Sequence, residues 1–108
     1  MQDSHGYTAL HRAVQNDNLG MVQYLIDNTD IDVKVKDKEG NTPLHSITGL
    51  GSANIKVEVV RVLVRHGANV NARDQDGNTP LCTAITEHIE GVKEVVKLLI
   101  ECGADVNA

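Results

Sequence analysis

Apolar residues recur at helical spacing in three separate stretches of the chain. In each stretch two adjacent apolar residues are followed, after two intervening positions, by two more: Met21, Val22, Leu25 and Ile26; Val59, Val60, Leu63 and Val64; Val95, Val96, Leu99 and Ile100. This spacing places the apolar side chains on one face of a helix. The pattern therefore predicts three amphipathic helices, each with one face turned toward a core.

A shorter helix is expected before each of these three. Thr42 precedes Pro43 and Thr79 precedes Pro80, and a hydroxyl residue followed by proline is typical of a helix start. The predicted short helices cover residues 9–16, 43–49 and 80–88. Gly67 and Gly103 follow two of the long helices, where glycine commonly ends a helix, and Asn28 lies near the corresponding place in the first.

Internal repetition organises the whole chain. The sequence Gly-Asn-Thr-Pro-Leu occurs at 40–44 and again at 77–81, and residues 67–72 recur at 103–108 with one Asn-to-Asp change. A degraded copy of the first motif lies at 6–11. Repetition at the spacing of these copies, which start at residues 6, 40 and 77, is typical of a solenoid built from stacked units.

Three units account for a single domain over residues 1–108, with approximate bounds 3–36, 37–73 and 74–108. An Asp-x-x-Gly quartet opens each unit. Asp favours a tight turn by accepting hydrogen bonds from nearby backbone N–H groups, and Gly supplies the positive φ that closes it.

These motifs together resemble the ankyrin repeat, whose period and Thr-Pro-Leu-His motif they share. The resemblance covers all three units. It implies an all-α repeat solenoid of helix-turn-helix units with hairpin-like loops projecting to one side. It also implies a non-enzymatic module that binds a protein partner through the concave face of loop tips and first helices.

The resemblance further implies which residues face that partner, namely those inside each turn and those that end each first helix. They are Ser4, His5, Tyr7, Gln15, Asn16, Lys38, Glu39, Asn41, Leu50, Gln75, Asp76, Asn78 and Glu87. Tyr7 is the best single anchor, because a tyrosine ring buries area while its hydroxyl keeps a hydrogen-bond partner; the alternative is a solvated turn residue. Leu50 is the second candidate, unless it folds back onto the neighbouring helix. The strip is mixed to acidic, which favours partners with neutral or basic surfaces.

The connections between the paired helices are longer in the second and third units, at 48–54 and 86–91. Insertions in a solenoid map to loops on one face and often serve binding. Neutral drift is the other interpretation, because lengthening a surface loop costs little.

Reactive side chains form no catalytic constellation, so no enzyme, cofactor or metal site is predicted. His11 and His45 occupy the slot in which the resemblance implies a structural hydrogen bond to the loop backbone. Cys82 stands in the same slot of the third unit and is expected to lack that bond and to pack as a small apolar group. Residues 74–77 do not make a calcium loop, because the position for the first carboxylate falls on Ala72.

Charge and composition narrow the partners and the compartment. The net charge is −5 with scattered basic residues, which disfavours nucleic acid as the main partner. We expect no membrane insertion and no secretory signal. Cys82 and Cys102 are expected to be thiols in a reducing compartment, cytoplasmic or nuclear. The family resemblance marks Asn71 and Asn107 as positions open to hydroxylation.

The third unit keeps the apolar pattern of an internal unit at Cys82, Ile85, Val96 and Ile100. A terminal unit normally presents a polar outer face. Two explanations stay open, a segment of a longer array or self-association through this unit. The alternative to a binding module is accordingly a structural spacer or self-associating segment.

Overall fold

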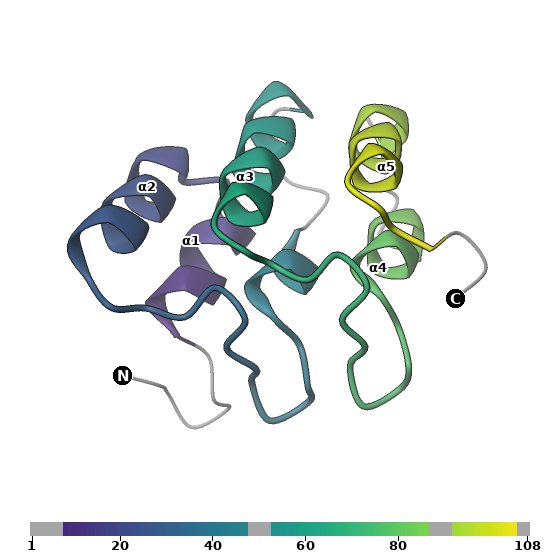
Figure 1. Ribbon diagram of the computed structural model, residues 1–108, viewed down its shortest axis with the longest axis horizontal. Coiled ribbons are helices and arrows are strands. Elements are labelled where there is room, and N and C mark those ends of the chain that lie inside the picture. Colours follow the sequence, from purple (N-terminus) through teal and green to yellow (C-terminus); the bar gives the residue numbers. More distant parts are fainter. Residues whose placement is uncertain (1–7, 48–52, 87–91, 106–108) are drawn as a thin grey trace.

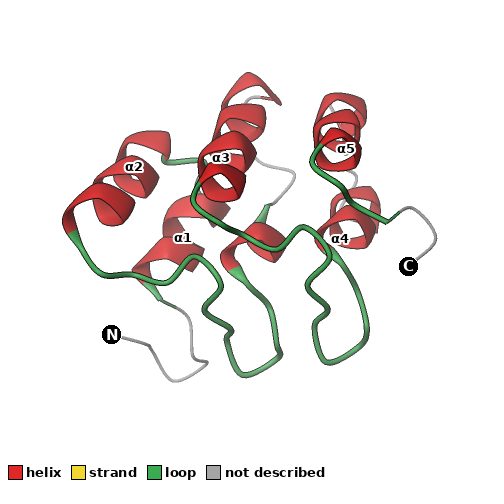
Figure 2. Ribbon diagram, viewed as in Figure 1, coloured by secondary structure: helices red, strands yellow, loops and turns green. Residues whose placement is uncertain are grey.

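The computed structural model describes residues 8–47, 53–86 and 92–105. Its elements in chain order are α1 (Ala9–Gln15), α2 (Leu19–Asn28), the 3-10 helix η1 (Pro43–Ser46), α3 (Ala53–Arg65), α4 (Pro80–Thr86) and α5 (Val92–Glu101). Figure 2 shows these helices joined by loops, and the described residues contain no strand. The predicted all-α class is confirmed.

The helices form two layers (Figure 1). The first layer contains α1, η1 and α4, with η1 in contact with both neighbours. The second layer contains α2, α3 and α5, in which α3 contacts α2 on one side and α5 on the other. The loops that follow α2 and α3 project away from both layers on the same side. This is the stacked arrangement that the repeats predict.

Local sequence signals explain where the helices start. Thr8 is the N-cap of α1, and its backbone N–H donates to Nδ1 of His11 at 3.2 Å while its Oγ1 accepts from the His11 N–H at 3.4 Å. Thr42 repeats this contact, its N–H donating to Nδ1 of His45 at 3.1 Å. Each exchange satisfies N–H groups that a helix start leaves without partners.

Glycine ends α3 and α5 as predicted. Gly67 has φ +96° and Gly103 has φ +101°. Behind the first, the Ala68 N–H donates to the Leu63 carbonyl at 3.0 Å; behind the second, the Ala104 N–H reaches the Leu99 carbonyl at 2.9 Å. These bonds satisfy the last carbonyls of the helices. In the first unit Asn28 instead belongs to α2, as its last residue.

The first helix of the second unit differs from the prediction of residues 43–49. Among the described residues 43–47, only Pro43–Ser46 are helical, in one 3-10 turn, and Ile47 is extended with ψ 127°. A β-branched residue is restricted at χ1 in a helix and is favoured in extended backbone, which fits an early end at Ile47. The predictions for residues 48–52 and 87–91 lie outside the described residues.

The loop predicted over the inserted segment 48–54 is also too long at its C-terminal end. Ala53 and Asn54 belong to α3. As a result α3 begins ten residues before its Leu63, whereas α2, in the unit without the longer connection, begins six residues before the equivalent Leu25. The insertion therefore lengthens a helix by about one turn.

The core lies between the two layers and consists of leucine, valine and other aliphatic side chains. Its most buried members include Leu10, Leu44, Val60, Leu63 and Leu99. Among the described residues no aromatic ring takes part, since Tyr24 is 59% exposed. Medium-sized side chains suffice because each unit packs only against its neighbours.

A buried ion pair joins the first and second units. Nζ of Lys56, in α3, lies 2.7 Å from Oδ2 of Asp17, with the two side chains 0% and 8% exposed. Asp17 occupies the turn between α1 and α2 with φ +53°, a conformation that Asp tolerates better than most residues. The extra turn of α3 is therefore fixed to the neighbouring unit.

Candidate partner-binding surface

Two loops of matching geometry form the candidate surface, at residues 37–41 and 74–78. In the first, Oδ1 of Asp37 accepts from the N–H groups of Glu39 at 2.8 Å and Asn41 at 2.9 Å. In the second, Oδ1 of Asp74 accepts from the N–H groups at positions 76 and 78, both at 2.9 Å. Each carboxylate thus holds its own turn in one shape, as the Asp-x-x-Gly quartets predict.

The two loops contact each other directly. The N–H of Gln75 donates to the Glu39 carbonyl at 2.9 Å. Gly40 stands at this contact with φ +80°, and a Cβ there would lie 2.9 Å from the backbone nitrogen of Gln75. Gly40 is therefore required both by the turn and by the close approach of the next loop.

Histidines brace these loops from the first-helix layer. Nδ1 of His11 accepts from the Thr8 N–H, so Nε2 carries the hydrogen and donates to the Asn41 carbonyl at 2.9 Å. His45 repeats the arrangement, with Nε2 donating to the Asn78 carbonyl at 2.9 Å. Each histidine thereby links its own unit to the loop of the next one. The predicted structural hydrogen bonds are confirmed.

Burial lowers the pKa of His45 below its ordinary value of 6.5, because the charged imidazolium loses hydration. The hydrogen bond to the Asn78 carbonyl and the nearby carboxylate of Asp74 act in the opposite direction and only partly offset this effect. His45 is consequently suited to its bracing role in the neutral form.

The equivalent residue of the third unit, Cys82, is half-buried. Its Sγ accepts a hydrogen bond from Oγ1 of Thr79 at 3.4 Å. This bond corrects the expectation that the thiol packs only as a small apolar group, and it is the main cause that lowers the pKa of Cys82. A hydroxyl that donates to sulfur favours the thiolate.

The structure describes eight of the thirteen predicted partner-binding residues. Among those described, Asn41 is half-buried and the others have exposed side chains: Gln15, Asn16, Lys38, Glu39, Gln75, Asp76 and Asn78. Ser4, His5, Tyr7, Leu50 and Glu87 lie outside the described residues. The structure brings together the six loop residues, which we call the loop surface: Lys38, Glu39, Asn41, Gln75, Asp76 and Asn78.

Gln15 and Asn16 do not join the loop surface. They lie at the C-terminal end of α1, whereas the bond from His11 to the loop leaves near the N-terminal end. A seven-residue helix spans about 10 Å, so these two side chains lie at the far end of the first-helix layer from the loops.

Asn71, for which the family resemblance indicated possible hydroxylation, links the second unit to the third. Its Nδ2 donates to the Gly103 carbonyl at 3.0 Å, and its Oδ1 accepts from the Asp105 N–H at 2.7 Å. Asn107 lies outside the described residues.

The described part of the chain contains no group of three or more His, Cys, Asp or Glu side chains placed to hold a metal ion. None of its helices is both long and apolar enough to cross a membrane.

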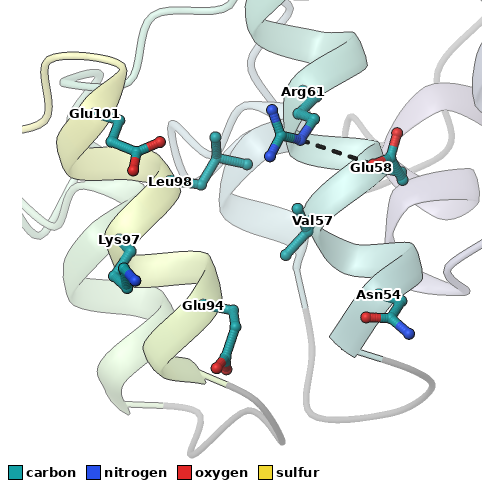
Figure 3. A pocket seen from close by; sticks show the side chains of 8 residues that line it. All are labelled: Asn54, Val57, Glu58, Arg61, Glu94, Lys97, Leu98 and Glu101. Carbon is teal, nitrogen blue, oxygen red and sulfur yellow. Dashed lines mark ion pairs between the residues drawn. The ribbon is translucent and has the colours of Figure 1, made fainter.

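Sequence reasoning missed a groove of about 420 Å³ between α3 and α5, drawn in Figure 3. It is lined by Asn54, Val57, Glu58, Arg61, Glu94, Lys97, Leu98 and Glu101. The four lining residues of each helix follow helical spacing in the sequence, so the sequence alone is enough to predict that they form a ridge on that helix. Which ridges face each other depends on the packing of the two helices, which the sequence pattern leaves open.

Comparison with known families decides the class of protein. A family model described as ankyrin repeats in three copies matches residues 30–108, and one described as ankyrin repeats in many copies matches residues 1–45. This chain belongs to the ankyrin-repeat family. Ankyrin repeats are in general non-enzymatic modules for protein–protein interaction, and the suggested resemblance is confirmed.

Individual ankyrin-repeat relatives align along nearly the whole chain. The E3 ubiquitin-protein ligase KEG of Arabidopsis thaliana is 30% identical over 99% of the chain. The B-cell lymphoma 3 protein homolog of Mus musculus is 34% identical over 98%, and the BCL-6 corepressor-like protein 1 of Homo sapiens is 34% identical over 93%.

This ankyrin-repeat chain spans only 6%, 23% and 5% of the lengths of these three relatives, in the same order. Their names therefore describe proteins that are much larger than the matched region. The ligase name in particular belongs to a protein of which this chain spans 6%.

Proposed function

We propose that this ankyrin-repeat domain is a non-enzymatic module that binds a protein partner through its concave face, with the loop surface at the centre of the contact. One observation carries the proposal: the two loops are joined by the bond from the Gln75 N–H to the Glu39 carbonyl and braced by His11 and His45. Their exposed side chains stand on a fixed backbone. A preorganised surface loses little conformational entropy on binding.

The chemistry of the loop surface favours a partner with a neutral or basic patch. Lys38 is its one cation, and Glu39 and Asp76 are its exposed carboxylates. Gln75 and Asn78 add side-chain amides that both donate and accept hydrogen bonds. Tyr7 remains the proposed aromatic anchor of the contact. Two cysteine thiols are in keeping with a reducing compartment, cytoplasmic or nuclear.

A second candidate function is a structural spacer or a self-associating segment of a longer array. The specific observation in its favour is the third unit, where Ile85 is 54% and Ile100 is 45% exposed. Exposed aliphatic side chains favour contact with a further repeat unit or with a second copy of the chain.

Affinity capture with paired baits tests the binding proposal. One bait is the unaltered chain, and the second carries Tyr7→Ala, Glu39→Lys and Asp76→Lys together. A third carries Asp27→Lys and Asp30→Lys, two exposed carboxylates outside the loop surface, and so has the same change in net charge. Circular dichroism first establishes that all three baits fold.

The proposal predicts a partner that the unaltered and third baits capture and the second loses. With that partner purified, Tyr7→Ala alone is expected to weaken binding by about 2 kcal/mol. A partner captured equally by all three baits contradicts the assignment of the loop surface. If the chain captures only itself, and Ile85→Lys with Ile100→Lys abolishes that, the spacer function replaces the proposal.

A further inference from the structure

The groove between α3 and α5 lies in the second layer and so belongs to a different face from the loop surface. Each helix contributes four lining residues at positions i, i+3, i+4 and i+7: Asn54, Val57, Glu58 and Arg61 from α3, and Glu94, Lys97, Leu98 and Glu101 from α5. This spacing forms one continuous ridge on each helix. The groove is therefore an elongated channel about two helical turns long, bounded by two parallel ridges (Figure 3).

The floor of this channel is apolar. Leu98 is only 6% exposed and Val57 is half-buried, and both side chains lie between the two helices in Figure 3. The lining offers a place for an apolar side chain of moderate size, since the groove volume of about 420 Å³ exceeds that of any one side chain. Such a floor with a polar rim is typical of surfaces that receive an amphipathic helix.

Among the charged side chains of the rim, some form an ion pair and others do not. Nε of Arg61 lies 3.7 Å from Oε1 of Glu58, so these two charges partly offset each other. Glu94 and Glu101 are exposed and, among the described residues, make no hydrogen bond or ion pair. They stand two turns apart on either side of Leu98, about 10 Å along the axis. With three carboxylates against two cations, the lining is negative overall.

The extra turn of α3 helps to build the channel. Asn54, the first residue of the α3 ridge, belongs to the turn by which α3 starts earlier than α2 relative to their equivalent leucines. Two residues further on, the buried bond of Lys56 to Asp17 fixes this turn to the first unit. The wall of the groove is thus held in place before any partner arrives.

We propose that this groove is a second docking surface, which takes an amphipathic basic helix of a protein partner. The helix would place a leucine-like side chain on Val57 and Leu98. Lysine or arginine residues on either side of it, two turns apart, would pair with Glu94 and Glu101. Charge complementarity favours a basic helix over an acidic one, because the carboxylates of Glu94 and Glu101 would repel an acidic helix.

A synthetic peptide supplies the probe. It is a helix-favouring peptide of about 15 residues, with the pattern Lys-x-x-x-Leu-x-x-Lys on one face and alanine or glutamine elsewhere. A matched peptide carries glutamate in place of both lysines. Fluorescence anisotropy measures the dissociation constant of each peptide with the whole chain, and chemical-shift changes of the backbone amides locate the contact.

The groove predicts binding of the basic peptide and not of the acidic one, with shifts concentrated in α3 and α5. Glu94→Lys with Glu101→Lys should weaken binding roughly tenfold, and added salt should weaken it further. Lys97→Gln should tighten binding, because it removes the cation of the α5 ridge. An increase in affinity cannot arise from a folding defect.

Two control pairs keep the groove distinguishable from other surfaces. Asp27→Lys with Asp30→Lys makes the same charge change outside the groove, and Glu39→Lys with Asp76→Lys makes it on the loop surface. Both should leave the affinity within about twofold of the unaltered chain. The proposal is overturned if either control weakens binding as much as the groove pair. It is also overturned if Lys97→Gln fails to tighten binding, or if the basic peptide does not bind below about 1 mM.

Discussion

The loops at 37–41 and 74–78 share one motif and one backbone geometry, yet their surroundings differ. Their glycines have φ +80° and +81°. A Cβ on Gly40 would press on the backbone of Gln75, whereas a Cβ on Gly77 would meet no described atom within 4 Å. Asp37 is buried and Asp74 is half-buried. The motif therefore determines the backbone conformation of the turn. Contact with the adjoining unit determines how much each residue of that turn contributes to stability.

The same difference in surroundings is found in the first-helix layer, between the equivalent residues His45 and Cys82. His45 donates to the Asn78 carbonyl of the following unit, and its side chain is 4% exposed. Cys82 stands in the equivalent position, is half-buried, and its thiol accepts from Thr79 of its own unit. In a solenoid the stability of each unit includes its contact with the next one. A substitution at a position in contact with the next unit should accordingly lower the free energy of unfolding more than the equivalent substitution at a position without that contact.

The largest expected effect tests the joint between the first and second units. Asp17→Asn leaves the ammonium of Lys56 buried without its carboxylate, and the free energy of unfolding should fall by about 3 kcal/mol. Urea denaturation measures the change. Glu58→Gln is the matched control, because it breaks an ion pair on the exposed surface of one helix and should cost at most about 0.5 kcal/mol. Equal losses in the two variants would show that the buried pair does not fix the joint.

The next effect compares the two loops at their glycines. Gly40→Ala should cost about 2 kcal/mol, because the positive φ is strained for alanine and its Cβ also displaces the adjoining loop. Gly77→Ala has the strain alone and should cost about 1 kcal/mol. Thermal or urea unfolding of both variants measures the difference. The contrast between the loops fails if Gly77→Ala proves as damaging as Gly40→Ala.

The smallest effect is the pH dependence contributed by His45. Since burial lowers its folded-state pKa, the unfolded chain takes up a proton near pH 6.5 while the folded chain does so only at lower pH. Stability from this group is therefore lost as the pH falls below about 6.5. His45→Gln should show a shallower fall in unfolding free energy between pH 7 and pH 5 than the unaltered chain. Parallel curves for the two proteins would contradict a buried neutral His45.

Features that depend on neighbouring residues were predictable from the sequence. The helix starts after Thr42 and Thr79 follow from the hydroxyl residue and the proline that comes next, and the glycine ends at 67 and 103 follow from backbone freedom. The bonds of His11 and His45 to the next loop followed from the family resemblance. Because such signals recur in successive units, they can be recognised in the sequence.

Features that depend on how units pack were not predictable in the same way. The 3-10 turn of η1 and the extra turn of α3 arise where the second unit departs from the repeat. The buried pair of Lys56 and Asp17 joins residues 39 positions apart, and the repeat contains no counterpart that would reveal it. The groove between α3 and α5 likewise depends on which ridges meet, a property of helix packing rather than of either helix alone.

The most direct test of the proposed function is a hydrogen-exchange footprint of the partner captured by the unaltered chain. Amide exchange is measured across the chain with and without that partner at saturating concentration. Binding through the loop surface predicts that protection increases at 37–41 and 74–78, with little change in α2. Protection confined to the third unit or to the second-layer helices, with both loops unchanged, would contradict binding through the loop surface.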